Sequence, residues 1–298
     1  MTDPHYALWV KRSAYFTLTM SLCIVSLKLY ASIETNAAAM LASFTDAMLD
    51  VLVSGLNFLA LRYALKPADD DHRFGHGKAE AVMALFQAAF LTGAAVLLLY
   101  QSGSRLFSPE PIQELSQGIG ITLVCMLLTT CLVLVQRWII AKTGSLAVQA
   151  DSAHYRGDLL MNAAVLMALV LVAQGIWWAD AVMTSAIALY LCFNAWQLGG
   201  ESMRHLLDEE LDEPQRQMII DTLQQLPGVI AADQLRTRQG GPHIFIQLRL
   251  VLPDDWSLQQ AHDVVDLAEQ QIANLFPRAD VIIHADPESA LPEPELRF

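Results

Sequence analysis

The chain has 298 residues, of which 54% are hydrophobic and only 16% are charged. Soluble domains carry roughly 25% charged residues, so the composition excludes an ordinary soluble domain. The net charge of −13 is concentrated at one end, because the segment from Asp208 to Phe298 holds 17 of the 31 acidic residues and 6 of the 18 basic ones. Such an acidic region argues against nucleic acid as a partner, since nucleic acid selects basic surfaces.

Six apolar stretches before Asp208 are long enough to be transmembrane helices. About 20 residues, each rising 1.5 Å, cross the hydrocarbon core of a bilayer. The stretches, separated by polar or turn-rich segments, are Ala14–Ile33, Ala37–Leu61, Ala79–Tyr100, Ile119–Val135, Leu146–Val172 and Ala179–Leu198. The sequence therefore predicts an α-helical membrane protein with six transmembrane helices, which form a domain of residues 1–207.

The basic residues of the connecting segments predict the orientation, because cytoplasmic loops are enriched in Lys and Arg. With the N-terminus in the cytoplasm, the inside segments before Asp208 carry nine basic residues, whereas the outside loops carry only Arg105. The nine are Lys11, Arg12, Arg62, Lys66, Arg73, Lys78, Arg137, Lys142 and Arg204. An even number of spans then returns the acidic C-terminal segment to the cytoplasm.

The segment 208–298 has the pattern of a small α+β domain. Ile or Leu occupies every second position from Ile244 to Leu250, which is typical of a strand with one buried face. The turn-forming run Gln239–Pro242 precedes that strand. The other predicted elements are helix Glu213–Leu226, strand Val229–Thr237, helix Leu258–Leu275 and strand Asp280–His284. This α-β-β-α-β order predicts a ferredoxin-like cytoplasmic domain.

Two pairs of ionisable residues lie inside predicted spans. Asp46 and Asp50 are four residues apart in the second span, and His154 and Asp158 have the same spacing in the fifth. That spacing puts both members of a pair on one face of a helix. Each carboxylate at the bilayer centre costs on the order of 2.5–3.5 kcal/mol, so three carboxylates require a compensating partner.

A divalent cation is the partner that suits these four side chains. One imidazole cannot neutralise three carboxylates, whereas one nitrogen and three oxygen ligands suit tetrahedral Zn²⁺ and accept Cd²⁺, Fe²⁺ or Mn²⁺. The alternative is that these groups are protonated, or hydrogen-bonded to neighbours such as Asn57 and Asn162 as structural links between helices. Two pairs at matching depth favour the metal site, because intramembrane ionisable residues generally mark function.

Two further charged residues, Lys28 and Arg156, lie in predicted spans outside this ligand set. The ammonium of Lys28 is expected to reach the outer interface at the end of its long side chain. Arg156 falls between His154 and Asp158 in the sequence but on another face of the helix, so the sequence gives it no role. The four cysteines lie in apolar stretches without metal-ligand spacing, and we expect them to be packing residues.

The predicted cytoplasmic connection between the second and third spans combines acids and histidines with glycines that allow tight turns. Asp69, His72 and His76 are candidate ligands of a second metal ion, and Asp70 or Asp71 can substitute on spacing alone. A solvated acidic loop is the alternative on the sequence alone.

Five motifs cover nearly the whole chain in a fixed order. They are Leu41–Asp50, Arg73–Glu80, Ala150–Asp158, Leu235–Gln239 and Val281–Pro287. With these motifs the sequence resembles the cation diffusion facilitator family, and within it the bacterial zinc and iron efflux proteins of the YiiP type. The resemblance implies a homodimeric metal/proton antiporter with six spans per subunit and a ferredoxin-like cytoplasmic domain.

The resemblance also implies roles for particular residues. It assigns the transport site to the two intramembrane pairs, in agreement with their spacing, and it assigns the loop site to the Asp and the two His residues named above. These are Asp46, Asp50, His154 and Asp158 for transport, and Asp69, His72 and His76 for the loop. A charge interlock of the family carries over onto Lys78 and Asp208.

The sequence departs from the family in the cytoplasmic domain, where relatives of this type have a two-metal site. His262, His284 and Asp286 match that site, but Asp233 and Arg249 stand where the close relatives carry histidines. Arg249 stays protonated and offers no lone pair, so it repels a cation or replaces one by pairing with an acid. We therefore expect one metal ion or none per subunit here, with Asp233 either a ligand or the ion-pair partner of Arg249, within the chain or across the dimer.

The sequence thus favours proton-coupled efflux of a divalent metal across the bacterial inner membrane, with Zn²⁺ as the first substrate. Protons and metal compete for the same Asp and His lone pairs, and an imidazole such as that of His154 titrates nearest to physiological pH. The alternative is a membrane-anchored metal sensor without net transport. A metallohydrolase is disfavoured because four protein ligands leave no open position for water, so no enzyme activity is expected.

Overall fold

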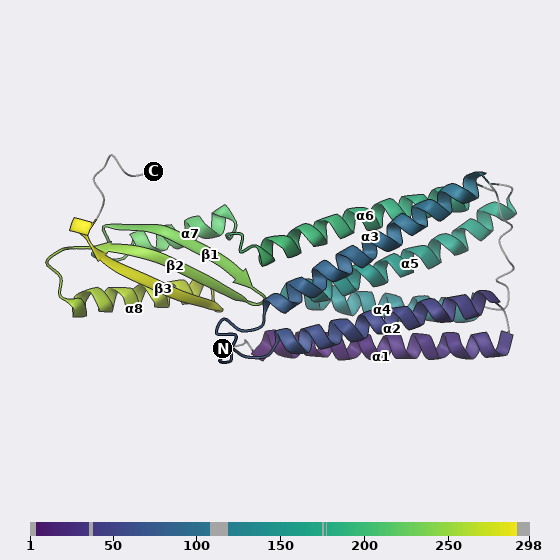
Figure 1. Ribbon diagram of the computed structural model, residues 1–298, viewed down its shortest axis with the longest axis horizontal. Helices are drawn as coiled ribbons and strands as arrows, with labels where there is room; N and C mark the ends of the chain where they lie inside the picture. The colour runs from purple at the N-terminus through teal and green to yellow at the C-terminus, as the bar shows by residue number, and fades with distance from the viewer. Residues whose placement is uncertain (1–3, 36–37, 108–118, 175, 177, 291–298) are drawn as a thin grey trace. The chain divides into compact units, whose positions relative to one another are not determined.

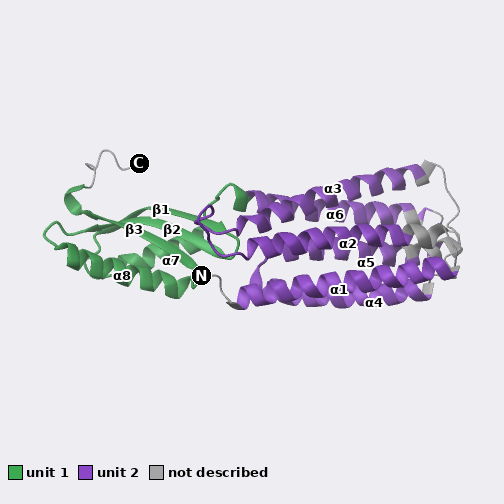
Figure 2. Ribbon diagram, turned by 60° about the horizontal axis from the view of Figure 1, so that its bottom comes forward, with its two compact units in different colours: residues 1–3, 204–298 green, residues 4–203 purple. Residues whose placement is uncertain are grey.

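A computed structural model of the chain describes residues 4–35, 38–107, 119–174, 176 and 178–290. These residues form two compact units, one of residues 4–203 and one that begins at Arg204 (Figure 2). The first unit is all helical, and the second combines helices with a sheet.

The first unit contains the six long helices that the apolar stretches predict (Figure 1). They are α1 (Pro4–Thr35), α2 (Ala38–Ala64), α3 (Lys78–Phe107), α4 (Ile119–Thr143), α5 (Leu146–Ala173) and α6 (Ala179–Leu206). Within the described residues, α1, α2, α3, α4 and α6 are apolar enough by length and composition to cross a membrane. With 28 residues α5 is also long enough to span, and it carries Asp151, Arg156 and Asp158 in its first half.

The helices extend beyond the predicted apolar stretches. α1 begins at Pro4 rather than at Ala14. Hydropathy marks only the part of a helix that suits hydrocarbon, and polar residues continue the helix into the interface. The predicted fourth stretch, Ile119–Val135, ends too early for the same reason, because α4 continues to Thr143. Only Gly144 and Ser145 separate α4 from α5.

Helix α1 runs alongside α2 and also contacts α4, while α5 contacts both α3 and α4 (Figure 1). A buried cluster joins α1, α2, α4 and α5 near the beginning of α1. It consists of Tyr6, Val10, Ala14, Leu61, Leu65, Ile139, Ala147 and Val148. A second cluster, which includes Leu91, Ala153 and Leu191, joins α3, α5 and α6. Together these clusters hold α5 in the middle of the bundle.

A buried carboxylate joins three helix ends. Glu80, in the first turn of α3, is 3% exposed. It accepts hydrogen bonds from the Tyr6 hydroxyl at 2.7 Å, from the Ser145 hydroxyl, and from the backbone N–H of Ala147 at 3.3 Å. Because Ala147 belongs to the first turn of α5, Glu80 satisfies the N-terminal end of that helix, where negative charge is stabilised.

Helix α6 is followed by a residue in the left-handed conformation. Asp208 has a φ of 58°, and the N–H of Glu209 donates to the carbonyl of Arg204 at 3.0 Å. This bond closes the last helical turn in the manner of a Schellman motif. Asp adopts the left-handed region more readily than most other residues, which fits its position here.

The second unit has the predicted α-β-β-α-β order. Its elements are α7 (Glu213–Gln224), β1 (Ala231–Gly240), β2 (His243–Leu252), α8 (Leu258–Leu275), β3 (Ala279–Pro287) and a short 3₁₀ helix (Glu288–Ala290). The sheet order is β1-β2-β3, with β1 antiparallel and β3 parallel to β2 (Figure 1). Because β1 continues to Gly240, the turn contains only Gly241 and Pro242, fewer residues than predicted.

The core of the second unit forms on one face of β2. Ile246, Leu248 and Leu250 are buried there, as their alternation predicts. The two helices cover this face with Ile219 and Leu223 from α7 and with Ala268 and Ile272 from α8. Asp233, Arg249 and His284, which are polar residues of the three strands, do not belong to this core.

Candidate functional site

Helices α2 and α5 bring three of the four predicted transport ligands together. His154 Nε2 lies 3.0 Å from Asp50 Oδ1 and 3.5 Å from Asp158 Oδ2. One ligand atom from each of the three side chains lies within 4.8 Å of the other two. One nitrogen and two oxygens around a common point is an arrangement that suits a small divalent cation such as Zn²⁺.

The fourth predicted ligand, Asp46, does not join this group. It lies one helical turn before Asp50 on α2, and it is exposed. Four residues along a helix correspond to about 6 Å along its axis, so two residues on one face lie at different depths. In this structure Asp46 is therefore a neighbour of the three-residue cluster and not a member of it.

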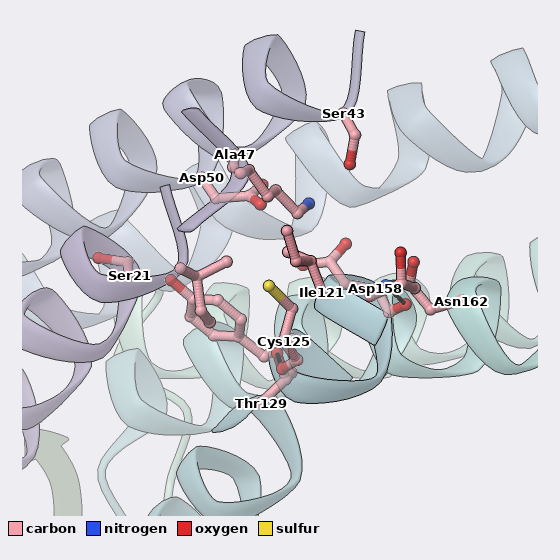
Figure 3. Close-up of a pocket in the computed structure, with 13 residues that line it drawn as sticks. Ser21, Ser43, Ala47, Asp50, Ile121, Cys125, Thr129, Asp158 and Asn162 are labelled. Carbon is pink, nitrogen blue, oxygen red and sulfur yellow. Dashed lines mark hydrogen bonds between the residues drawn. The ribbon is translucent and has the colours of Figure 1, made fainter. Parts of the chain in front are cut away.

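A cavity lies beside the carboxylates of Asp50 and Asp158, between α1, α2, α4 and α5. Its volume is about 30 Å³, which is enough for a water molecule or an ion without its hydration shell. Figure 3 shows Asp50 and Ser43 on the α2 side of the cavity, and Cys125 and Asp158 on the opposite side. Two of the three clustered side chains, Asp50 and Asp158, thus line a space within the bundle.

Two residues of the cavity wall were not predicted to line a cavity. Lys28, expected to reach the outer interface, shares a face of α1 with Ser21 and Ile24, and all three line the cavity. Cys125 is buried as a packing residue, but it also forms part of the cavity wall.

Arg156 is not part of that wall and contacts its own helix, because its Nε donates at 3.2 Å to the carbonyl of Ser152.

The asparagines that offered an alternative to a metal site bind the backbone instead. Asn162 Nδ2 donates to the carbonyl of Asp158 at 2.8 Å, and Asn57 Nδ2 donates to the carbonyl of Ala147 at 3.5 Å. Within the described part of the chain, neither amide donates to the carboxylate of Asp50 or Asp158. The structure therefore lends no support to these asparagines as partners of the acids.

Sequence reasoning did not consider another buried acid near the site, Asp151. It is 2% exposed, and its Oδ2 accepts a hydrogen bond from Gln136 Nε2 at 2.8 Å. The same amide donates to Thr17 Oγ1 at 3.0 Å, so the network joins α1, α4 and α5. The signal was present in the sequence, because Asp151 is an additional acid of the fifth span, three residues before His154.

The loop between α2 and α3 gathers the second predicted group. Asp69 Oδ1 lies 3.1 Å from His72 Nδ1, and Asp69 Oδ2 lies 3.3 Å from His76 Nε2. Ligand atoms of all three side chains lie within 4.8 Å of one another. Asp70, an alternative ligand on spacing, instead pairs with Arg73 at 2.9 Å. The loop thus offers one carboxylate and two imidazoles to an ion.

A tight turn brings the two loop histidines together. Gly75 has a φ of 78°, which favours glycine, and its N–H donates to the carbonyl of His72 at 2.9 Å. The rings of His72 and His76 are 4.4 Å apart. The backbone N–H of His72 donates to Asp69 Oδ1 at 2.7 Å, and this bond lowers the pKa of Asp69 because it stabilises the carboxylate.

In the second unit, Arg249 lies at the centre of an ion-pair cluster. Its Nε and Nη2 donate to the two oxygens of Asp233 at 2.7 and 2.6 Å, and its Nη1 lies 3.5 Å from Asp286 Oδ2. Asp233 is opposite Arg249 on β1, and His284 is opposite it on β3. The Asp233 hydrogen bonds raise the pKa of Arg249. The ion pair considered from the sequence therefore forms within one chain.

The predicted cytoplasmic ligands are not gathered at one point. His284 Nε2 lies 2.8 Å from Asp286 Oδ1, but the other oxygen of Asp286 faces Arg249. His262, on α8, lies 3.5 Å from Asp266 instead. In the described part of this unit, no third ligand atom joins His284 and Asp286. The expectation of one metal ion or none stays a prediction.

The two residues of the implied charge interlock lie at element ends. Lys78 begins α3, and Asp208 follows α6. Asp208 Oδ1 lies 3.5 Å from Arg238 Nη1 in its own unit, and the Arg238 guanidinium lies 4.7 Å from the ring centre of Phe245. The interlock between Lys78 and Asp208 stays a prediction.

Comparison with known proteins agrees with both units. Residues 14–207 match the cation efflux transmembrane domain, and residues 211–288 match the cytoplasmic domain of cation efflux proteins. The cation-efflux pump FieF of Shewanella oneidensis is 45% identical over 287 residues, which cover 96% of this chain and 97% of that protein. FieF of Yersinia pestis is 42% identical over 291 residues, which cover 98% of this chain and 97% of that protein.

A solved structure of the zinc form of CzrB is 30% identical and covers 29% of this chain and 99% of its own, with a TM-score of 0.28. The family matches and the nearly full-length relatives confirm the resemblance drawn from the motifs. The chain therefore belongs to the cation efflux family and is a multi-pass membrane transporter with a cytoplasmic C-terminal domain, not an enzyme.

Proposed function

We propose that this transporter exports divalent metal ions, Zn²⁺ first, in exchange for protons, and that Asp46, Asp50, His154 and Asp158 form its transport site. The observation that carries the proposal is the cluster of Asp50, His154 and Asp158 beside a cavity inside the helical bundle. The imidazole favours Zn²⁺ over harder ions, while the carboxylates also accept Fe²⁺, Cd²⁺ and Mn²⁺.

Proton exchange follows from the geometry at His154. Its Nε2 faces both Asp50 Oδ1 at 3.0 Å and Asp158 Oδ2 at 3.5 Å. An ionised carboxylate only accepts hydrogen bonds, so a proton on Nε2 gives these carboxylates a hydrogen-bond donor when no metal is bound. A metal ion takes the lone pair of the same atom, which must then give up its proton. Loading with metal and loading with protons are therefore mutually exclusive at this atom.

The helix connections support an orientation with both termini in the cytoplasm. The cytoplasmic domain follows α6, so the end of α6 lies at the cytoplasmic face. Ser102, late in α3, bonds Ser185, early in α6, at 2.6 Å, so α3 begins at the same face where α6 ends. The contacts of Glu80 with Tyr6 and Ala147 support the same face for the beginnings of α1 and α5.

In this orientation the cavity lies in the outer half of the bundle. Its wall includes Lys28 from the later part of α1, Ser43 from the early part of α2, and Asn162 from beyond Asp158 on α5. The buried cluster around Tyr6 lies at the other end. This arrangement supports access to the site from the outside, the state in which an exporter releases its metal and takes up protons.

We further propose a homodimer in the bacterial inner membrane, divided into a membrane domain of residues 1–207 and a cytoplasmic domain of residues 208–298. The nearly full-length bacterial relatives and the match to the cytoplasmic domain of cation efflux proteins support this assignment.

Asp69, His72 and His76 form a second, regulatory Zn²⁺ site in the loop. Lys78 and Asp208 form the charge interlock. Asp208→Asn is the conservative test, because Asn tolerates the left-handed conformation about as well as Asp does.

A membrane-anchored metal sensor is the second candidate function, and the loop cluster is the observation that favours it. Asp69 and His72 are about half exposed there, so cytoplasmic metal reaches them directly. A sensor has no need of a cavity with ligands inside the membrane bundle, however. Export therefore explains more of the molecule than sensing does.

Flux measurements separate the two candidates. The full chain is reconstituted into proteoliposomes with an imposed pH gradient, and uptake of Zn²⁺, Cd²⁺, Fe²⁺ and Mn²⁺ is followed. An antiporter moves metal against the proton flow, and reversing the gradient reverses the direction. A protein that binds Zn²⁺ but produces no flux above that of empty vesicles would be the sensor, and the transport proposal would be wrong.

A further inference from the structure

A basic residue forms part of the wall of the transport cavity. Lys28 lies on the same face of α1 as Ser21 and Ile24, and all three line the cavity beside Asp50 and Asp158. The ligand chemistry proposed for the site uses only its acids and its imidazole. A fixed positive charge at this place in a cation transporter therefore requires its own explanation.

Lys28 interacts electrostatically with acids of two other helices, Asp46 on α2 and Asp158 on α5. Among the residues that the structure describes, it forms no ion pair closer than 4.0 Å. Its charge thus acts on the carboxylates from a distance. Their oxygens keep the lone pairs that a metal ion needs.

The net charge of the proposed four-ligand site depends on Lys28. As a metal ligand His154 is neutral, and the three acids proposed as ligands, Asp46, Asp50 and Asp158, carry three negative charges when ionised. Lys28 cancels one of them, and a single divalent ion cancels the other two. Because uncompensated charge at membrane depth is costly, the site with Lys28 is matched to an ion of charge two.

We propose that Lys28 sets the net charge of the transport site. With Lys28 present, one bound divalent ion makes the site neutral, and repulsion by Lys28 lowers the affinity for that ion enough for its release. A transport site must bind well enough to load and weakly enough to unload. Lys28 repels the bound ion through a medium less polar than water, where the interaction is stronger. It acts through the ligands and is not one itself, since an ammonium has no lone pair.

The test compares Lys28→Met, which keeps the length and removes the charge, with Lys28→Arg, which keeps the charge. Lys11→Met makes the same change at an exposed position of the same helix and is the matched control. For Lys28→Met we expect Kd for Zn²⁺ and kcat of flux each to fall about tenfold, and for the other two variants values within about twofold of wild type. Binding is measured by titration calorimetry, and flux in proteoliposomes.

A purely structural role gives a different result. It lowers kcat without lowering Kd, so an unchanged or raised Kd in Lys28→Met would overturn the proposal. If Lys28→Met fails to insert into the membrane, Lys28→Gln gives the same comparison. Tb³⁺ supplies a second measurement as an inhibitor of Zn²⁺ flux. Repulsion scales with ionic charge, so its inhibition constant should fall by a larger factor than the Zn²⁺ Kd, and a smaller factor contradicts the proposal.

The inference rests on the proposed transport site, and Asp50→Ala separates the two. Only the Zn²⁺ binding that Asp50→Ala removes is counted as binding at this site. If Asp50→Ala abolishes flux while Lys28→Met leaves Kd unchanged, the role given to Lys28 is wrong and the site stands. If Asp50→Ala transports normally, the site itself is wrong.

Discussion

The membrane cluster and the sheet cluster of the cytoplasmic unit use the same kinds of side chain, namely carboxylates and a histidine with a basic residue nearby. In the sheet, Arg249 donates to both oxygens of Asp233, at 2.7 and 2.6 Å. In the bundle, the carboxylates of Asp50 and Asp158 share the single Nε2 atom of His154. The two clusters differ in how completely their acids are occupied.

This difference shows that the position of the basic residue decides whether an acidic cluster can hold an exchangeable cation. A guanidinium in bidentate contact uses the lone pairs that a metal ion needs. An ammonium at a greater distance, such as that of Lys28, changes the electric field but leaves the ligand atoms available. In the sheet cluster the guanidinium occupies both oxygens of Asp233, whereas the ligand atoms of the membrane cluster lie together without such a contact.

Removing a proposed ligand of the membrane cluster should have the largest effect, because it acts on transport itself. In Asp50→Ala and Asp158→Ala we expect Zn²⁺ flux to fall by at least about a hundredfold, because the remaining ligands cannot complete a tetrahedral site. Insertion and dimer formation should persist, since loss of a buried carboxylate eases insertion. Proteoliposome flux and size-exclusion chromatography measure the two properties, with exposed Asp70→Ala as the control. Near-normal flux in either variant would remove the cluster from the mechanism.

Replacing the guanidinium with a ligand should make the sheet cluster resemble the membrane cluster. In Arg249→His we expect the full chain to bind about one additional Zn²⁺ per subunit, because an imidazole lone pair replaces a cation. Equilibrium dialysis with metal analysis counts the ions. Arg249→Lys keeps the charge and should bind no more metal than the wild type. If Arg249→His gains no ion, Asp233 becomes the residue that prevents binding.

Changing the ligand type within the membrane cluster should shift metal preference. In His154→Asp we expect the ratio of Zn²⁺ flux to Mn²⁺ flux to fall about tenfold, because an all-oxygen site loses the nitrogen that favours Zn²⁺. Parallel flux assays with Zn²⁺, Cd²⁺ and Mn²⁺ give the ratio. Equal relative fluxes in wild type and variant would argue that His154 is not a direct ligand.

The smallest effect concerns the stability of the sheet cluster. Arg249→Ala should lower the free energy of unfolding of the cytoplasmic unit by about 1 kcal/mol, since its charge-assisted bonds are partly screened by solvent. Hydrogen exchange at the amides of β1 and β2 measures the change. Arg236→Ala, at an exposed position of β1, is the matched control. A more stable Arg249→Ala would mean that the ion pair does not compensate its own desolvation.

The sequence is sufficient for the ligand pairs but not for their depth. His154 and Asp158 share a face because a helix repeats every 3.6 residues, and this holds whatever surrounds the helix. Asp46 obeys the same rule, yet it stays outside the cluster because packing of α2 against α5 sets which turn meets His154. The place of Lys28 in a cavity wall is not predictable for a similar reason: only the neighbouring helices determine whether its face meets lipid or a cavity.

In the cytoplasmic unit, alternation predicts the buried face of β2 but not the register of its neighbours. Asp233 lies opposite Arg249 next to an irregularity of β1, where Gln234 has a φ of 51°. A bulge of this kind shifts the pairing of the whole strand, and glycine is its usual signal. With Gln at that position, the strand pattern alone does not predict this register. The proximity of Asp233, Arg249 and His284 was expected only from the family resemblance.

The hydrogen bond from Tyr6 to Glu80 has a practical consequence for protein engineering. The first apolar stretch predicted from the sequence begins at Ala14, so the residues before it invite truncation in expression work. A shortened protein that begins after Tyr6 loses one donor to a carboxylate that is 3% exposed, at a cost of about 1–3 kcal/mol. Because Glu80 also satisfies the first turn of α5, such trimming would loosen the helix that carries His154 and Asp158.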